Sequence, residues 1–389
     1  MNLRRASLFA VTGTAVATVF LASLVGASSS SAVPSPSSSP SASPTPTPTS
    51  TTVTLQLPKK YTPKGTNGGT DDYRCFLMPA PKTTGDQIIT SVNVQPDNKK
   101  IVHHAILYLI PASSVAQAVK QSGKDGRQGW SCFGDVGLPI TDLATYQQDA
   151  PWLAAWAPGV PAQTFPTGTG MRFPVGSRIV LQMHYNLLAG HGPDRSKVVL
   201  KVQRDDGSLT PLHTMLLLAP VELACPKGVH GKLCNRAASV AEMVKRSNAA
   251  AQELADGLNY LCYHAAPRPR LVSTCTWQAQ GPMTIWAIAG HMHLLGKSIS
   301  VDVGTSPAQR ILNIKVWNFD DQRARKLATP LAIPSGTPLT ITCTHNPKLR
   351  QLLPSLRKLP PRYVTWGDGS SDEMCLSMVL YSVPPKPAG

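Results

Sequence analysis

Short apolar runs, separated at close intervals by proline and glycine, constrain the fold of this chain more than any other feature. The chain contains 36 prolines and 29 glycines. Between them, alternation of the kind seen at Ile179, Leu181 and Met183 is typical of strands with both faces buried. The pattern predicts an all-β fold of antiparallel β-sandwiches rather than βαβ units. The strongest runs are Ile101–Ile110, Ser177–Tyr185, Trp286–His293 and Cys375–Ser382.

One helix is expected in the second half of the chain. Ser239–Glu242 has the pattern of a capping box, which commonly begins a helix. Apolar residues then recur at roughly helical spacing, at Val240, Met243, Val244, Leu254 and Leu258. The segment lies between Cys234 and Cys262, so we expect a helical insertion fixed by disulfides.

The N-terminus has the pattern of an export signal, predicted over residues 1–32. Arg4 and Arg5 precede an apolar run, Leu8–Val25, and small residues suited to cleavage follow. An uncleaved membrane anchor is the alternative, because the run approaches the length of a spanning helix. We expect the protein to be secreted or associated with the cell envelope.

Residues 33–54 are almost entirely Ser, Pro, Thr and Ala, which predicts a disordered stalk because such a segment has little to bury. Two interpretations of this stalk remain open: it is a spacer that associates the protein with a cell envelope, or it is a simple linker. The remaining chain suits two domains of roughly 150 residues each. We place them at residues 55–207 and 208–389, with the boundary near Asp205–Ser208.

Eight cysteines lie beyond the stalk, and an even number in an exported chain predicts disulfide bonds. No pair has C-x-x-C spacing, and spacing alone leaves their connectivity open. The net charge of +16 does not point to nucleic acid, because export separates the chain from it. A cationic surface weakly attracted to anionic envelope polymers is the better interpretation.

Five histidines and one methionine form the candidate metal ligands. His291 and His293 would share one face if both lay on a strand. His103 and His104 would point to opposite faces of a regular strand, so both can bind one ion only if the strand bulges or ends there. Imidazole combined with the thioether of Met374 favours copper over zinc or iron. His184 completes the set. Taken alone, each of these residues is more typical of a protein core than of a metal site.

Six segments resemble the copper type II, ascorbate-dependent monooxygenase family of peptidylglycine α-hydroxylating monooxygenase and dopamine β-hydroxylase. They occur in the family's order within residues of about 60 to 382, which is essentially the whole folded part. They are Asp71–Cys75, Val102–His104, Trp156–Gly159, Val180–Tyr185, His291–Gly296 and Asp372–Cys375.

The resemblance implies two jelly-roll-like domains that face each other across a solvent-filled cleft, with two coppers per chain. It implies an electron-storage copper held by His103, His104 and His184. It implies a catalytic copper held by His291, His293 and Met374, where dioxygen binds and substrate hydrogen is abstracted. It also implies the disulfides Cys75–Cys132 and Cys343–Cys375, and it places Tyr73 and Gln182 near the first copper. We expect His345 at the surface or behind the ligands.

The chain departs from the family pattern at the substrate. The peptide-amidating members carry an arginine at the position of Ala289, and polar substrate contacts at those of Leu376 and Met378. An apolar pocket cannot bind a carboxylate through charge-assisted hydrogen bonds. With Leu380, these residues predict a less polar small-molecule substrate. The segment Cys225–Cys275 is longer than in the family and either caps the cleft or braces the domain.

The expected function is therefore an exported dicopper monooxygenase. It would hydroxylate a C–H bond of a small molecule using dioxygen and ascorbate or a similar small reductant. A non-catalytic exported copper-binding or copper-buffering protein is the alternative, and a purely structural envelope domain is a third. The monooxygenase and copper-buffering hypotheses share the same ligands and differ in whether oxygen is consumed.

Overall fold

The computed structural model describes residues 50–65, 70–132, 136–138, 152–188, 190–247, 249–369 and 371–385. The predicted signal 1–32 and the predicted stalk up to residue 49 lie outside the described residues. Within the described ranges, no helix has the length and apolar character needed to cross a membrane.

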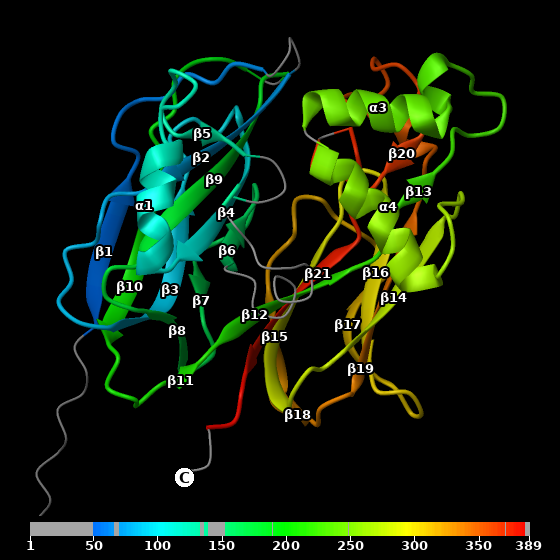
Figure 1. Ribbon diagram of the computed structural model, residues 1–389. Helices are drawn as coiled ribbons and strands as arrows, with labels where there is room; N and C mark the ends of the chain where they lie inside the picture. Colours follow the sequence, from blue (N-terminus) through cyan, green and yellow to red (C-terminus); the bar gives the residue numbers. More distant parts are fainter. Residues whose placement is uncertain are drawn as a thin grey trace, which may run out of the picture. The chain divides into compact units, whose positions relative to one another are not determined.

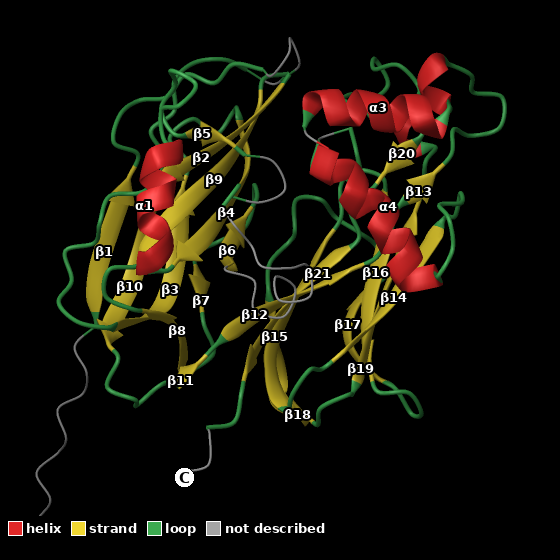
Figure 2. Cartoon of the chain, viewed as in Figure 1, coloured by secondary structure: helices red, strands yellow, loops and turns green. Residues whose placement is uncertain are grey.

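The fold is mostly β, as the sequence predicts, and antiparallel pairing dominates it (Figures 1 and 2). Two sheets are built mainly from the chain before Leu212. One has the order β1 (Thr51–Gln56), β10 (Lys197–Arg204), β3 (Gln87–Gln95), β8 (Thr169–Phe173) and β11 (Thr210–Pro211), with β7 (Gln163–Thr164) also on β3. The other has the order β5 (Trp130–Ser131), β2 (Asp71–Leu77), β9 (Arg178–Asn186), β4 (Val102–Ile110) and β6 (Trp152–Trp156).

Three sheets are built from the chain after Leu212. The first has the order β12 (His213–Leu218), β21 (Leu376–Ser382), β15 (Met283–His291) and β18 (Arg325–Ile333). The second has the order β14 (Val272–Gln278), β19 (Pro338–His345), β16 (Gly296–Val303) and β17 (Gln309–Ile314). The third is the short pair β13 (Glu222–Leu223) and β20 (Val364–Thr365). The predicted division at 207/208 falls between β10 and β12, but it stays a prediction.

The predicted strand-like runs are confirmed, and their alternation builds the core. Ile179, Leu181 and Met183 of β9 enter the core beneath β10 and β3. Val180, on the opposite face of β9, packs with Ala118 of helix α1 (Ala112–Gln121). Both faces of β9 are therefore covered, which explains why apolar side chains occur on both of them, at Ile179, Val180, Leu181 and Met183.

The predicted stalk ends earlier than expected. Thr51–Thr54 belongs to β1, which pairs with β10 from Thr51↔Val202 to Gln56↔Lys197. Threonine and valine favour strands, and Leu55 is buried. Hydrogen bonding to β10 at the edge of the sheet therefore orders the last residues of the predicted stalk.

The helical insertion is present, but the expected start is wrong. It contains two longer helices, α3 (Arg236–Arg246) and α4 (Ala249–Tyr263), after the 3-10 turn η2 (Lys232–Cys234). Asn235, not Ser239, caps α3, because its side-chain oxygen accepts a hydrogen bond from the Ala238 amide at 3.1 Å. Ser239 lies inside the helix and donates to the Tyr363 carbonyl at 2.6 Å. A further short helix, α5, spans Leu349–Leu352.

Four disulfides pair all eight cysteines. The implied bonds Cys75–Cys132 and Cys343–Cys375 are confirmed. The sequence left the other pairing open, and the structure has Cys225–Cys234 before α3 and Cys262–Cys275 after α4. Such a set fits an oxidising, extracellular environment.

Candidate metal centre

A β-bulge brings the adjacent histidines of β4 toward the same point. In the pairing of β4 with β9, Val102 faces Tyr185 and His104 faces His184, so the register skips His103. The extra residue re-aims one side chain, as bulges do. The distortion predicted from His103 and His104 is therefore confirmed.

The three Nδ1 atoms of His103, His104 and His184 face one another. The Nδ1 of His103 lies 3.1 Å from that of His184 and 3.3 Å from that of His104, and the third separation is 3.3 Å. A point equidistant from the three atoms lies roughly 1.9 Å from each, close to the length of a metal–imidazole bond. The donor set and its spacing therefore fit a metal ion.

His103 and His104 are held neutral, which is the form that binds metal. Burial, followed by the nearby His184, lowers the pKa of His103 to about 3. Burial, then His184 and His103, lowers the pKa of His104 well below its ordinary value. Protonation of His103 and His104 is therefore disfavoured at neutral pH.

Asp71 fixes the orientation of His184, a role that the sequence analysis missed. The Nε2 of His184 lies 2.7 Å from Oδ1 of Asp71, and the histidine is fully buried. A carboxylate accepts, so Nε2–H donates and the Nδ1 lone pair is left for a ligand. Asp71 stands two residues before Tyr73, in a segment that carries the family resemblance, and this is the only signal that could have indicated it.

Tyr73 contacts the first set, whereas Gln182, two residues before His184 on β9, contacts Cys132. The Tyr73 ring stacks on the His184 ring with centroids 4.0 Å apart and planes 13° apart. Its hydroxyl donates to the Asp368 carbonyl. The amide nitrogen of Gln182 lies 3.6 Å from Sγ of Cys132. Their observed contacts are packing and hydrogen bonding.

His291 and His293 come together although only His291 is in a strand. β15 ends at His291, so the expectation that both project from a strand is wrong, yet their ring centroids are 5.2 Å apart. Nδ1 of His291 lies 2.5 Å from Oε1 of Gln322, and Nδ1 of His293 lies 3.1 Å from the Asp372 carbonyl. Both partners are acceptors, so both Nδ1 atoms donate and both Nε2 lone pairs are free.

The Nε2 of His293 is the clearest sign of a missing partner. It is buried and has no hydrogen-bond partner within the described part of the chain. Burial lowers the pKa of His293 well below its ordinary value, so this nitrogen stays unprotonated. Buried polar atoms are rarely left unpaired, and a metal ion would satisfy this one.

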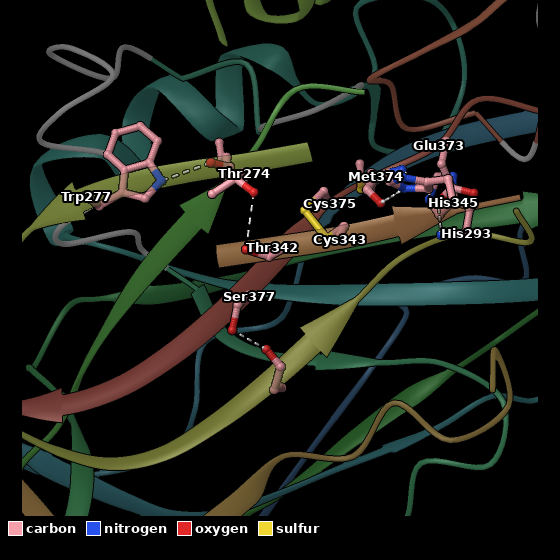
Figure 3. Close-up of a disulfide and its surroundings, with 12 residues drawn as sticks. Thr274, Trp277, His293, Thr342, Cys343, His345, Glu373, Met374, Cys375 and Ser377 are labelled. Carbon is pink, nitrogen blue, oxygen red and sulfur yellow. Dashed lines mark hydrogen bonds between the residues drawn. A yellow bond between two sulfur atoms is a disulfide. The ribbon is translucent and has the colours of Figure 1, made fainter. Parts of the chain in front are cut away.

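Met374 is held next to His293 by its neighbours (Figure 3). The Glu373 carboxylate accepts from the backbone amides of His293, Leu295 and Met374. Burial raises the pKa of Glu373 to about 8. His345 is buried rather than on the surface, and its Nε2 lies 3.4 Å from the Met374 carbonyl. With Cys343–Cys375, these contacts fix the loop that bears the thioether.

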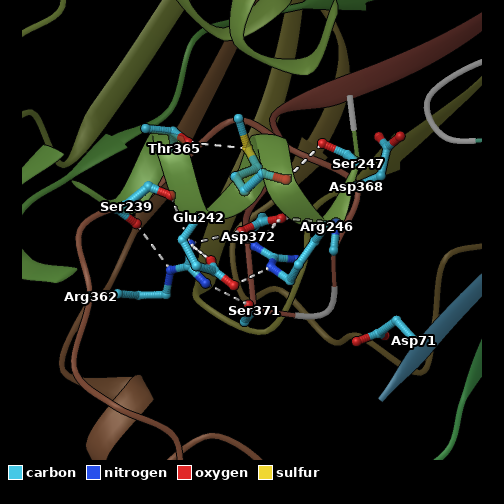
Figure 4. A network of polar contacts seen from close by, with 12 residues as sticks. Asp71, Ser239, Glu242, Arg246, Ser247, Arg362, Thr365, Asp368, Ser371 and Asp372 are labelled. Atoms are coloured by element: carbon cyan, nitrogen blue, oxygen red, sulfur yellow. Dashed lines mark hydrogen bonds and ion pairs between the residues drawn. The ribbon is translucent and has the colours of Figure 1, made fainter. Parts of the chain in front are cut away.

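The helical insertion braces the same loop (Figure 4). Arg246 of α3 donates to Asp372 at 2.9 Å and to Glu242 at 2.7 Å. Arg362 contacts Glu242 at 2.6 Å. The insertion also reaches the pocket described below through Leu254 of α4. These contacts favour the interpretation that the insertion braces the domain, and Leu254 is its contribution to the pocket lining.

The two ligand sets adjoin each other in the structure. The rings of His104 and His291 have centroids 6.5 Å apart, where the resemblance implies a solvent-filled cleft. The segment between β17 and β18 contacts both sets. Its Phe319 ring lies 5.3 Å from that of His103, and Nε1 of Trp317 donates to the His293 carbonyl at 3.1 Å.

A largely apolar pocket opens beside both sets. Its unfilled space is about 1090 Å³, including the opening to solvent. His104, His291 and Met374 line it, together with Ala289, Leu376, Met378 and the ring of Trp152. Leu380 does not line this pocket and instead packs in the core. Three of the four residues predicted to contact substrate therefore reach the pocket.

Comparison with known proteins adds no functional assignment. No protein-family model matches the chain, and no curated protein matches it. The chain is weakly similar to the major capsid protein P2 of bacteriophage PM2, with 8% identity, coverage of 87% of this chain and 99% of that chain, and a TM-score of 0.29. It is also weakly similar to an allantoicase (12% identity, 73% and 76% covered, TM-score 0.18) and to allantoicase of Saccharomyces cerevisiae (10%, 83% and 81%, 0.19).

Proposed function

We propose that the protein is an exported dicopper monooxygenase that hydroxylates a C–H bond of a small, apolar molecule. The proposal includes membership in the ascorbate-dependent family that the sequence resembles, with two jelly-roll-like domains. The observation that carries it is the triangle of Nδ1 atoms from His103, His104 and His184. In the tautomers that leave each Nδ1 unprotonated, a cation among these atoms, which lie 3.1 to 3.3 Å apart, would contact all three lone pairs.

The second set would hold the second ion through His291, His293 and Met374. Imidazole and thioether together are donors that accommodate both copper oxidation states. Bound copper would supply single-electron transfer and the activation of dioxygen. In the overall reaction one oxygen atom enters the C–H bond and the other leaves as water. Ascorbate or a similar reductant would supply the two electrons and two protons.

The chain's own residues would bind and orient the reactants. Ala289, Leu376 and Met378 offer an apolar surface next to His291, so a small molecule without a carboxylate would be held by burial. Gln322 and the Asp372 carbonyl hold the second-set imidazoles in one tautomer. Asp71 does the same for His184. An apolar pocket would also exclude water, which would limit side reactions of reactive intermediates.

A metal titration with matched variants tests the binding sites. Metal-free protein should bind two coppers per chain, His291→Ala should bind about one, and His191→Ala should bind two. His191 is exposed and lies outside both sets, so it is the matched control. Equal stoichiometry in all three proteins contradicts the assignment of ligands.

Oxygen uptake then separates an enzyme from a copper-buffering protein. The copper-loaded protein is supplied with ascorbate, a panel of small apolar compounds and isotopically labelled dioxygen. Incorporation of one labelled oxygen atom per product, lost in His291→Ala, supports the monooxygenase. Two bound coppers with no reductant-dependent uptake would instead support the buffering alternative.

A further inference from the structure

A second pocket shares no lining residue with the apolar pocket. Its unfilled space is about 650 Å³, including its opening. Leu223, Leu295 and Val364 give it an apolar wall, and Arg350, Arg357 and Arg362 also line it. No carboxylate lines it. All three arginines come from the basic segment 345–362.

Arg350 is buried without an acidic partner. Its exposed fraction is 7%. One Nη donates to the Ser371 carbonyl at 3.3 Å and the other to the Pro360 carbonyl at 3.1 Å. Its Nε has no hydrogen-bond partner, and among the described residues no carboxylate forms an ion pair with it. A buried charge without a counter-ion is unfavourable, so a partner is expected.

The neighbouring charges do not neutralise Arg350. Glu242 and Asp372 are shared by Arg246 and Arg362, with contacts from 2.6 to 3.9 Å. Two carboxylates thus face three guanidinium groups, and one positive charge remains. Burial, and then the charge of Arg362, lowers the pKa of Arg350 to about 10, which still leaves it charged at neutral pH.

We propose that this pocket is a binding site for a small oxyanion, a carboxylate or a phosphate, attached to a compact apolar group. The anion would pair with the buried Arg350 and with Arg357, an exposed arginine that also lines the pocket and has no ion pair among the described residues. Arginine recognises both oxyanions through its planar fork of donors. Leu223, Leu295 and Val364 would contact the apolar group.

The site is independent of the proposed copper chemistry, although it lies close to it. Leu295 donates its amide to Glu373 at 2.8 Å, and Arg350 donates to the Ser371 carbonyl in the segment before Met374. None of the residues that line the pocket is a proposed copper ligand, so anion binding can be measured on metal-free protein. A failure of this site would leave the copper assignment untouched, and the reverse also holds.

Calorimetric titration with inorganic phosphate and, separately, with malonate tests the proposal at constant ionic strength. We expect saturable binding of at least one anion, and the preferred anion separates a phosphate from a carboxylate ligand. Arg357→Gln should weaken that binding about tenfold or more, because a charge-assisted pair is lost. Lys358→Gln removes an equal charge from an exposed residue outside the pocket and should change it less than about twofold.

Arg350→Lys tests the buried end of the site. It keeps the charge but removes the fork of donors, so it should also weaken binding. If that variant does not fold, Arg357→Gln alone decides the question. The proposal is overturned if the protein binds neither anion in a saturable way. It is equally overturned if Lys358→Gln weakens binding as much as Arg357→Gln, since that result indicates attraction to the general positive charge.

Discussion

Replacement of Asp71 should weaken metal binding at the first set without removing any ligand. The carboxylate accepts from Nε2 of the buried His184 at 2.7 Å. In Asp71→Asn the amide oxygen can keep this hydrogen bond, but the negative charge that makes the imidazole a better donor is lost. In Asp71→Ala the bond itself is lost and the buried Nε2–H is left without its acceptor.

The magnitude follows from the role of such outer partners, whose loss typically weakens metal binding by about 10- to 100-fold. We therefore expect a weakening of about tenfold for Asp71→Asn and about 100-fold for Asp71→Ala, or about 1.4 and 2.7 kcal/mol. The order of the two variants is as informative as their size. It separates the contribution of charge from that of orientation.

Competition with a chromophoric copper chelator measures these affinities. A His291→Ala background leaves only the first set to bind copper. Asp206→Asn is the matched control, since it removes the same charge from a fully exposed side chain. Far-UV circular dichroism establishes that each variant is folded. Unchanged affinity in Asp71→Ala, or a loss no greater than that of Asp206→Asn, refutes the orienting role.

Three further predictions concern stability and are checked by urea unfolding of metal-free protein. Removing Cys343–Cys375, which closes 32 residues, should cost about 3.7 kcal/mol by the loop-entropy relation, and it should also weaken copper binding through Met374. Arg246→Met should cost about 3 kcal/mol, because it removes the cation that pairs with buried Asp372. Arg323→Met, at an exposed ion pair, should have a much smaller effect. A hydrogen bond from Arg74 lowers the pKa of Asp125 to about 2, so this pair stabilises the fold above pH 4 and the contribution disappears as the pH falls toward 2; Asp125→Asn should flatten that part of the pH profile.

The strands could be predicted because burial on both faces leaves a direct mark on composition. β21 is apolar or aromatic at five of its seven positions, β9 has apolar residues on both faces, and each strand coincides with a predicted run to within a residue. The start of α3 could not be predicted. Ser239 has the chemistry of a cap, and only tertiary contact with the Tyr363 carbonyl explains why it lies inside the helix.

The candidate ligands could be named from sequence, but their partners could not. The bulge at His103 followed from the alternation rule once the family resemblance implied that both histidines are ligands, because two adjacent ligands cannot share a face of a regular strand. Gln322 gave no signal, since a glutamine in a loop is common and its contact with His291 depends on how β17 and β18 are joined. Likewise, the pairing of Arg246 with Asp372 spans 126 residues and no local pattern specifies it.

The bulge at His103 also determines how β4 can change over evolutionary time. Because pairing on its two sides differs by one residue, deletion of a single residue near His103 would restore a regular ladder with β9. The shortened strand would be fully hydrogen-bonded to β9, but the deletion would move the three imidazoles apart. Length in this strand is therefore under tighter constraint than most side-chain identities, and insertions or deletions there should be as damaging as the loss of a ligand.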